Sequence, residues 1–227
     1  MFRFLALSLL GSLAFSAFAT AQKPDEKGIS IRLFAVAPNP NQGKVCFLIA
    51  GKRGEAFELP TFNLSDPQSV AAREIQLILS SAPTDSAPRP VSTIRLPDTG
   101  RDFRVILVPT TADSYQAVVV RGDDQTFRNG DAFFINLSSH PILGIIGTTK
   151  LDLKPGARET IRPTGASAGS FYQVKFARKE NEQLLPVADT RWPVLRNNRS
   201  FLIFFNGKDG LPTYRAVDEF LDPGAVP

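Results

Sequence analysis

Short runs of apolar or alternating residues, separated by turn residues, follow one another along the chain from residue 29. Ile29-Ser30-Ile31-Arg32-Leu33 alternates apolar and polar positions, as a strand with one buried face does. Further apolar runs occupy residues 45–50, 75–79, 105–108, 115–120, 132–137, 142–146, 151–153, 171–176 and 201–205. Clusters rich in Pro, Asn, Asp and Gly lie between them. This pattern predicts an all-β fold of antiparallel β-sandwiches.

Two of these runs suggest positions within a sheet. Residues 201–205 are apolar throughout, so we expect them in the centre of a sheet, joined by a turn at 206–210 to a neighbouring strand at 214–217. The alternating segment 29–33 is instead predicted to be an edge strand whose free backbone groups could pair with a partner strand.

Helix is predicted only in two short segments. Asp66-Pro67 before residues 68–74 supplies a capping side chain and a first-turn proline. Residues 216–221 are the second such segment.

Matching motifs recur in the same order along the chain, at an offset of about 93–99 residues. The matched motifs are Phe57-Glu58-Leu59-Pro60 with Leu151-Asp152-Leu153-Lys154-Pro155, Ile75-Gln76-Leu77 with Tyr172-Gln173-Val174, Phe103 with Phe201, and Tyr115 with Tyr214. A repeat of this length indicates duplicated domains rather than a solenoid. We therefore predict two tandem immunoglobulin-like antiparallel β-sandwich modules, residues 28–121 and 130–222, in which the matched residues overlay.

The first 21 residues have the features of an export signal. Arg3 precedes an apolar stretch at 4–18, and Ala19-Thr20-Ala21 is a small-residue cleavage site before Gln22. The apolar stretch is too short, and too often interrupted by Gly and Ser, to span a membrane stably. We expect a periplasmic or secreted protein with no membrane span in the mature chain.

Charge and cysteine content narrow the class of partner. The net charge of +4 is mild and no block of like charges stands out, so we expect no nucleic-acid binding. The single cysteine, Cys46, lies in an apolar run and is predicted to be buried. An exported protein without an intramolecular disulfide fits a bacterial periplasm better than a eukaryotic extracellular space.

The single histidine, His140, limits the chemistry that the chain could perform. It precedes Pro141 and is predicted to be a loop residue. Zinc and copper sites that need several His or Cys ligands are excluded, and no phosphate-binding glycine loop is present. We predict no catalytic residue, no metal site and no cofactor, with calcium binding at 122–124 or 209–210 as a weaker alternative. Whether two carboxylates converge in a cleft, as a glycosidase requires, stays open.

Residues 190–193, Thr-Arg-Trp-Pro, hold the one aromatic residue expected to be exposed. Arg191 and Trp192 are of the residue types enriched at binding hot spots, so both are candidate partner contacts. Alternatively, Trp192 covers one end of the second sandwich. The three tyrosines and most of the phenylalanines are expected to pack in the core.

The layout of an export signal and two sandwich modules resembles the immunoglobulin-like periplasmic chaperones of the chaperone–usher pathway. It resembles small periplasmic adaptor proteins of exopolysaccharide modification about equally. In those chaperones an Arg on an early strand and a Lys on the last strand of the first module hold a terminal carboxylate, which makes Arg32 and Arg121 the matching candidates. Residue 121 is Arg rather than Lys, and Leu96-Pro97-Asp98-Thr99-Gly100-Arg101 only partly matches the Leu-Pro-x-Asp-Arg-Glu run of the family.

The sequence thus favours an exported, non-enzymatic binding or structural protein of the bacterial cell envelope. Its expected partners are a protein or an envelope polysaccharide. Two alternatives stay open: a periplasmic chaperone or adaptor that works by β-strand addition, and a carboxylate-dependent hydrolase of an envelope polymer.

Overall fold

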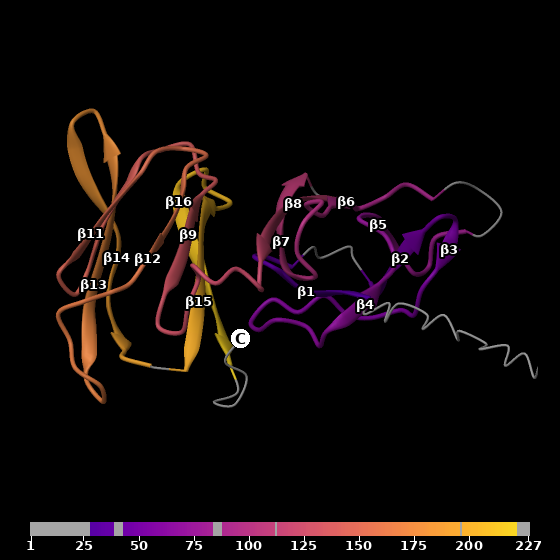
Figure 1. Ribbon diagram of the computed structural model, residues 1–227. Coiled ribbons are helices and arrows are strands. Elements are labelled where there is room, and N and C mark those ends of the chain that lie inside the picture. The colour runs from indigo at the N-terminus through magenta and orange to yellow at the C-terminus, as the bar shows by residue number, and fades with distance from the viewer. Residues whose placement is uncertain (1–27, 39–42, 84–87, 112, 196, 222–227) are drawn as a thin grey trace, which may run out of the picture.

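The computed structural model describes residues 28–38, 43–83, 88–111, 113–195 and 197–221. The export signal predicted at 1–21 lies outside these residues. The described part is all β, with 16 strands and no helix (Figure 1). The strands form four sheets of four strands each. This arrangement is consistent with two tandem β-sandwich modules, the fold class that the sequence predicts.

The first eight strands make two of the sheets. They are β1 (Ile29–Ala35), β2 (Val45–Ile49), β3 (Lys52–Arg53), β4 (Gln68–Val70), β5 (Glu74–Leu79), β6 (Ser92–Arg95), β7 (Asp102–Thr111) and β8 (Ser114–Arg121). Their orders are β4-β1-β7-β8 and β3-β2-β5-β6.

The last eight strands make the other two sheets. They are β9 (Ala132–Asn136), β10 (Ile142–Ile146), β11 (Thr149–Leu153), β12 (Arg158–Ile161), β13 (Phe171–Glu180), β14 (Gln183–Pro193), β15 (Asn198–Asn206) and β16 (Pro212–Phe220). Their orders are β12-β9-β15-β16 and β11-β10-β13-β14.

The two halves of the chain therefore share one topology, since adding eight to each strand number of the first half gives the order in the second. Both halves contain one parallel pair, β1 with β7 and β9 with β15, and the other strand pairs are antiparallel. Ile75 and Leu77 of β5 face the core of their own sandwich, as Tyr172 and Val174 of β13 do. This correspondence supports the predicted duplication.

The predicted overlay of Phe103 on Phe201 is wrong at the level of the residue. The two lie in equivalent strands, but Phe103 faces the core of the first sandwich, whereas Phe201 faces the contact between the modules. Tyr115 pairs with Pro109 near the end of its hairpin, while Tyr214 pairs with Phe204 further along the strand. Because β7 and β15 are apolar on both faces, the motifs could be aligned without revealing which face each residue occupies.

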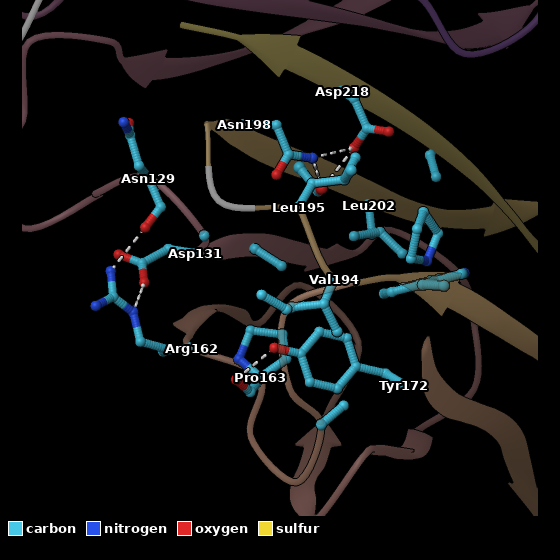
Figure 2. Close-up of a pocket in the computed structure, with 18 of the residues that line it drawn as sticks. Asn129, Asp131, Arg162, Pro163, Tyr172, Val194, Leu195, Asn198, Leu202 and Asp218 are labelled. Carbon is cyan, nitrogen blue, oxygen red and sulfur yellow. Dashed lines mark hydrogen bonds and ion pairs between the residues drawn. The ribbon is translucent and has the colours of Figure 1, made fainter. Parts of the chain in front are cut away.

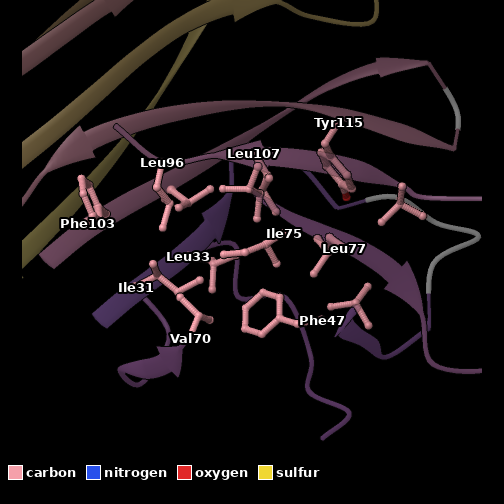
Figure 3. Packing of buried hydrophobic residues seen from close by; sticks show 14 of the residues in the cluster. Ile31, Leu33, Phe47, Val70, Ile75, Leu77, Leu96, Phe103, Leu107 and Tyr115 are labelled. Carbon is pink, nitrogen blue, oxygen red and sulfur yellow. The ribbon is translucent and has the colours of Figure 1, made fainter. Parts of the chain in front are cut away.

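Each module has its own apolar core. The first packs Ile31 and Leu33 of β1 and Phe103 of β7 against Ile75 and Leu77 of β5 (Figure 3). The second module is centred on an aromatic group in which the Phe176 ring contacts the rings of Phe134, Trp192, Phe204 and Tyr214 at 5.0–6.2 Å between ring centres. Edge-to-face contacts of this kind add to the stabilisation given by burial alone.

A third apolar cluster joins the modules. It contains Phe34 of β1 and Ile106 of β7 on one side and Phe133 of β9, Phe201 and Ile203 of β15 on the other. The sheets β4-β1-β7-β8 and β12-β9-β15-β16 are therefore inner layers, covered on both faces, and the whole molecule is a stack of four sheets (Figure 1). This explains why residues 201–204 are fully buried and confirms the central position predicted for them.

The prediction that 29–33 forms an edge strand is wrong. β1 lies between β4 and β7, with Ile31 paired to Gln68 on one side and to Phe103 on the other. Further along, Ser65 covers Leu33, because the Leu33 N–H donates to Ser65 Oγ at 3.0 Å and the Leu33 carbonyl accepts from the Ser65 N–H at 2.8 Å. Of the polar positions of β1, Arg32 lies near Glu219 of the other module and is only partly exposed.

Neither predicted helix is present. Residues 68–70 form β4 and residues 212–220 form β16. In both places pairing with a neighbouring strand outweighed a local helix signal of one or two turns, which is too short to be stable by itself.

The sequence analysis also missed β12 and β14. Both have mostly exposed or half-buried side chains, so they lack an apolar pattern. Their strand conformation comes instead from the long antiparallel pairings of β14 with β13 and of β12 with β9.

A buried group of charged residues lies at the contact between the modules. The Glu219 side chain on β16 is 1% exposed. Its Oε1 accepts a hydrogen bond from Arg104 Nε on β7 at 2.7 Å, and its Oε2 accepts one from Arg199 Nη2 on β15 at 2.7 Å. Arg32 Nη1 lies 3.7 Å from the same carboxylate, and Arg104 Nη1 also donates to Asp102 at 2.6 Å. Glu219 thereby connects both modules.

Both buried arginines are held by further interactions. Burial by itself would lower the pKa of Arg104, but its hydrogen bonds to Asp102 and Glu219 outweigh that effect and raise the pKa above its ordinary value. Arg199 Nη1 donates to the carbonyls of Gly122 and Phe127, in the segment between the modules, and its guanidinium lies 4.8 Å from the centre of the Phe127 ring. The charged group therefore also fixes the connecting segment.

Glu219→Gln should destabilise the protein by about 3–5 kcal/mol, because it removes the negative charge that compensates two buried guanidinium groups. Urea unfolding of wild type and variant measures this change. The matched control is Glu74→Gln, whose side chain is 66% exposed and 3.9 Å from Arg95. We expect the control to cost less than about 1 kcal/mol. Equal effects of the two substitutions would contradict this account of Glu219.

Candidate functional site

The second module contains a pocket of about 490 Å³ between its two sheets. This volume lies within the roughly 300–1,000 Å³ that is usual for small-ligand sites. Its walls come from the start of β9, the loop after β12, the end of β14 and the strands β15 and β16 (Figure 2). The lining residues are Asn129, Gly130, Asp131, Ala132, Arg162, Pro163, Ala166, Ser167, Ala168, Tyr172, Trp192, Pro193, Val194, Leu195, Asn198, Ser200, Leu202, Ala216 and Asp218.

Asp218 of β16 and Asn198 of β15 form the polar side of the pocket. Asp218 Oδ1 accepts hydrogen bonds from Ser200 Oγ at 2.5 Å and from Asn198 Nδ2 at 3.3 Å (Figure 2). Within the described ranges no cation forms an ion pair with Asp218, and neither its Oδ2 nor Asn198 Oδ1 accepts a hydrogen bond. Asp218 is exposed and Asn198 is 6% exposed. Two acceptor atoms with fixed positions thus remain available to a ligand.

Strand geometry explains why these groups meet. Successive residues of a strand point to opposite faces of the sheet. On β15, Arg199 therefore points to the contact between the modules while its neighbours Asn198 and Ser200 face the pocket. On β16, Glu219 likewise points to the contact between the modules and Asp218 to the pocket. The charged group and the pocket therefore lie on opposite faces of the β15–β16 pair.

Asp131 and Arg162 form the opposite side of the pocket. Arg162 Nε lies 2.7 Å from Asp131 Oδ1, and Arg162 Nη2 donates to the Asn129 carbonyl at 2.9 Å (Figure 2). Asp131 Oδ2 accepts from the Arg128 N–H at 2.7 Å. Both oxygens of Asp131 are therefore occupied, which makes it a structural carboxylate that holds Arg162 in place. Nη1 of Arg162 remains as a donor.

Aromatic side chains form a third wall. The Tyr172 hydroxyl donates to the Pro163 carbonyl at 3.2 Å, which fixes the ring against the loop after β12 (Figure 2). Trp192 is half-buried, and its ring centre lies 5.7 Å from that of Phe176 in the core. The pocket thus has rigid aromatic surfaces between its two polar sides.

The structure separates the four candidate partner contacts. Arg32 lies at the contact between the modules near Glu219, whereas Arg121 at the end of β8 forms an ion pair with Asp123 at 3.0 Å. Arg191 is exposed and lies 5.9 Å from the Phe171 ring, outside the pocket. Of the four, only Trp192 lines the pocket. It also packs against the second core, so it is not an exposed aromatic residue as the hot-spot hypothesis requires.

The sequence analysis missed the polar residues of the pocket. Asp131, Arg162, Asn198, Ser200 and Asp218 come from four short segments that only the fold brings together. The polar residues of β15 and β16 lie beside the apolar run 201–205, and no local pattern distinguishes them from solvated positions.

The residues weighed earlier for other chemistry have structural tasks. His140 lies in a loop, where its backbone carbonyl accepts a hydrogen bond from the buried Asn136 side chain at 2.8 Å. Cys46 is buried, as predicted. In the alternative calcium segment, Asp123 accepts from the Arg101 N–H and from Arg121. Partial desolvation by itself would raise the pKa of Asp123, but together these interactions outweigh it and lower the pKa below its ordinary value.

Clusters of metal-binding side chains and membrane-spanning helices are both absent from the described ranges. In those ranges no three His, Cys, Asp or Glu side chains gather closely enough to hold a metal ion. The same residues include no helix whose length and apolar character would let it cross a membrane.

A second hollow, of about 750 Å³, lies over β10, β11, β13 and β14. It contains the exposed apolar residues Ile145 and Leu184. Lys175 and Asp189 beside them pair with each other at 3.2 Å. Its lining also includes the charged residues Lys150, Asp152 and Glu159.

Comparison with protein-family models and with curated proteins finds no match to this chain. Any function assigned to the chain therefore depends on the pocket itself.

Gly147, in the turn between β10 and β11, keeps one wall of the pocket in place. Its φ is +60°, and a Cβ there would lie 1.9 Å from the Thr164 carbonyl oxygen and 2.9 Å from the Tyr172 ring. Gly147→Ala should therefore destabilise the protein by about 1–3 kcal/mol more than Gly156→Ala. Gly156 is the matched control, because its φ is +80° and the space around it is open. Urea unfolding measures both, and equal losses would show that only backbone conformation matters at Gly147.

Proposed function

We propose that this chain is an exported, non-enzymatic binding protein of a bacterial cell envelope, with proposed modules 28–121 and 130–222. In this proposal the second module holds a ligand in the pocket between its sheets, and the first module is fixed to it as a rigid support. The observation that carries the proposal is the pocket itself. It combines two available acceptors, a held guanidinium and aromatic walls, all on strands or on loops tied to them.

Convergent polar groups in a mostly preformed concave site are the usual mark of a ligand-binding site. Location outside the inner membrane is supported by the signal-like residues 1–21 and by the single cysteine.

The hydrolase is the weaker candidate. The pocket does bring two carboxylates together, Asp131 and Asp218, but acid–base catalysis needs groups that are free to exchange protons with a substrate. Asp131 is engaged at both oxygens by Arg162 and by the Arg128 N–H. The chaperone alternative depends on adding a partner strand at a free edge of β1. That edge is covered by β4.

Occlusion of the pocket tests its role in binding. We expect a thermal-shift screen of oligosaccharides, peptides and small metabolites to find a ligand that raises the Tm of the wild-type protein. The same ligand should not raise the Tm of Ala216→Trp, since Ala216 lines the pocket from β16. Thr213→Trp is the matched control, because Thr213 is an exposed residue of the same strand outside the pocket.

Melting of both variants without ligand establishes that they fold. A ligand that stabilises wild type and Ala216→Trp equally would assign binding to another surface.

Export is tested independently. The mature protein should begin at Gln22 and be found outside the inner membrane, as N-terminal sequencing and cell fractionation would show. A cytoplasmic product that retains Met1 would contradict the proposed location.

A further inference from the structure

The two available acceptors in the pocket match a ligand that presents at least two hydrogen-bond donors close together. Asp218 and Asn198 are adjacent, since Asn198 Nδ2 donates to Asp218 Oδ1 at 3.3 Å. Ser200 and Asn198 hold the carboxylate through neutral donors to Oδ1, so among the described residues Asp218 keeps its negative charge unpaired and its Oδ2 can still accept hydrogen bonds. Neighbouring hydroxyl groups of a sugar satisfy such a pair, because each hydroxyl donates one hydrogen bond.

The opposite side of the pocket requires an acceptor without a strong negative charge. Arg162 is already compensated by Asp131 at 2.7 Å, and its Nη2 is used by the Asn129 carbonyl. The remaining Nη1 suits a neutral oxygen better than an anionic group, which would also approach the Asp131 carboxylate. A sugar hydroxyl or ring oxygen accepts such a hydrogen bond, because hydroxyl groups are both donors and acceptors.

The wall between these two sides is aromatic. Trp192 and Tyr172 are held by Phe176 and by the Pro163 carbonyl, so their rings do not have to be ordered when a ligand binds. Aromatic rings with a polar edge suit ligands that have both apolar and polar surfaces, and the C–H face of a sugar ring is such a surface. An ammonium ion would use Asp218 but leave Nη1 of Arg162 unused, whereas a carboxylate would use Nη1 and leave Asp218 unused.

We propose that the pocket binds a neutral oligosaccharide segment, with Asp218 and Asn198 accepting from neighbouring hydroxyls and Arg162 donating to a sugar oxygen. This inference rests on the proposed binding function and specifies its ligand class. It makes no use of the second hollow or of the contact between the modules.

Trp192 provides a direct readout, because it is the only tryptophan in the chain. An array of bacterial surface oligosaccharides serves as the first probe. The glycan retained most strongly is then titrated while Trp192 fluorescence is followed, and calorimetry repeats the measurement on variants. We expect saturable binding that changes little between 50 mM and 500 mM salt, since no charge on the ligand is being paired.

Asp218→Ala should weaken binding of that glycan about tenfold or more, because the lost hydrogen bonds are to a charged acceptor. The matched control is Asp152→Ala, an exposed aspartate on β11 that does not line the pocket, and it should bind like wild type. Unchanged melting of both variants shows that the loss is local. Equal affinity of Asp218→Ala and wild type would overturn the assignment of the site.

Spermidine is titrated in parallel as a cationic competitor. If no array glycan binds, while spermidine changes Trp192 fluorescence in a salt-dependent way that Asp218→Ala abolishes, the ligand class is cationic. The oligosaccharide inference then fails, but the pocket remains a binding site as the proposed function requires. If neither probe binds, the oligosaccharide inference is overturned, and the screen with Ala216→Trp decides independently whether the proposed function fails as well.

Discussion

The carboxylate of Glu219 is the interaction on which the arrangement of the two modules depends. Apolar contact between the inner sheets supplies attraction but little direction, because burial of apolar surface is not directional. A buried carboxylate is tolerated only where its charge is paired and its oxygens are hydrogen-bonded. Arg104 from the first module and Arg199 from the second meet this requirement together. We infer that the charged group selects one orientation of the modules while the apolar cluster stabilises it.

The same two strands then determine the pocket. β15 and β16 have one face toward the first module and the other toward the interior of the second sandwich. On the first face, Arg199 binds both Glu219 and the backbone of the connecting segment. On the second face, Asn198, Ser200 and Asp218 present polar atoms to the pocket. A change that loosens the contact between the modules should therefore also disturb the pocket. Because two modules of the same topology pack together, the middle pair of sheets is covered on both sides.

Rigidity is the property that most favours a binding role. Arg162 is held by Asp131 and a backbone carbonyl, Tyr172 by the Pro163 carbonyl, and Asp218 by Ser200 and Asn198. A ligand that enters such a site meets groups already in position, so less conformational freedom is lost on binding. The same engagement of Asp131 weakens the case for catalysis, since a carboxylate fixed by two donors is poorly placed to exchange a proton with a substrate.

The sequence by itself determined the fold class and most of the apolar strands, because alternation and turn residues are local signals. Its repeated motifs also indicated two halves, which share one strand order. It also placed 201–205 in the centre of a sheet. It could not determine that β1 is internal, because only the return of residues 65–70 covers that edge. Nor could it show that Phe103 faces the core of the first module while Phe201 faces the contact between the modules, since both strands are apolar on both faces. The pocket was decided entirely by tertiary structure: its polar atoms come from segments far apart in sequence, and each polar residue taken alone resembles an ordinary solvated position.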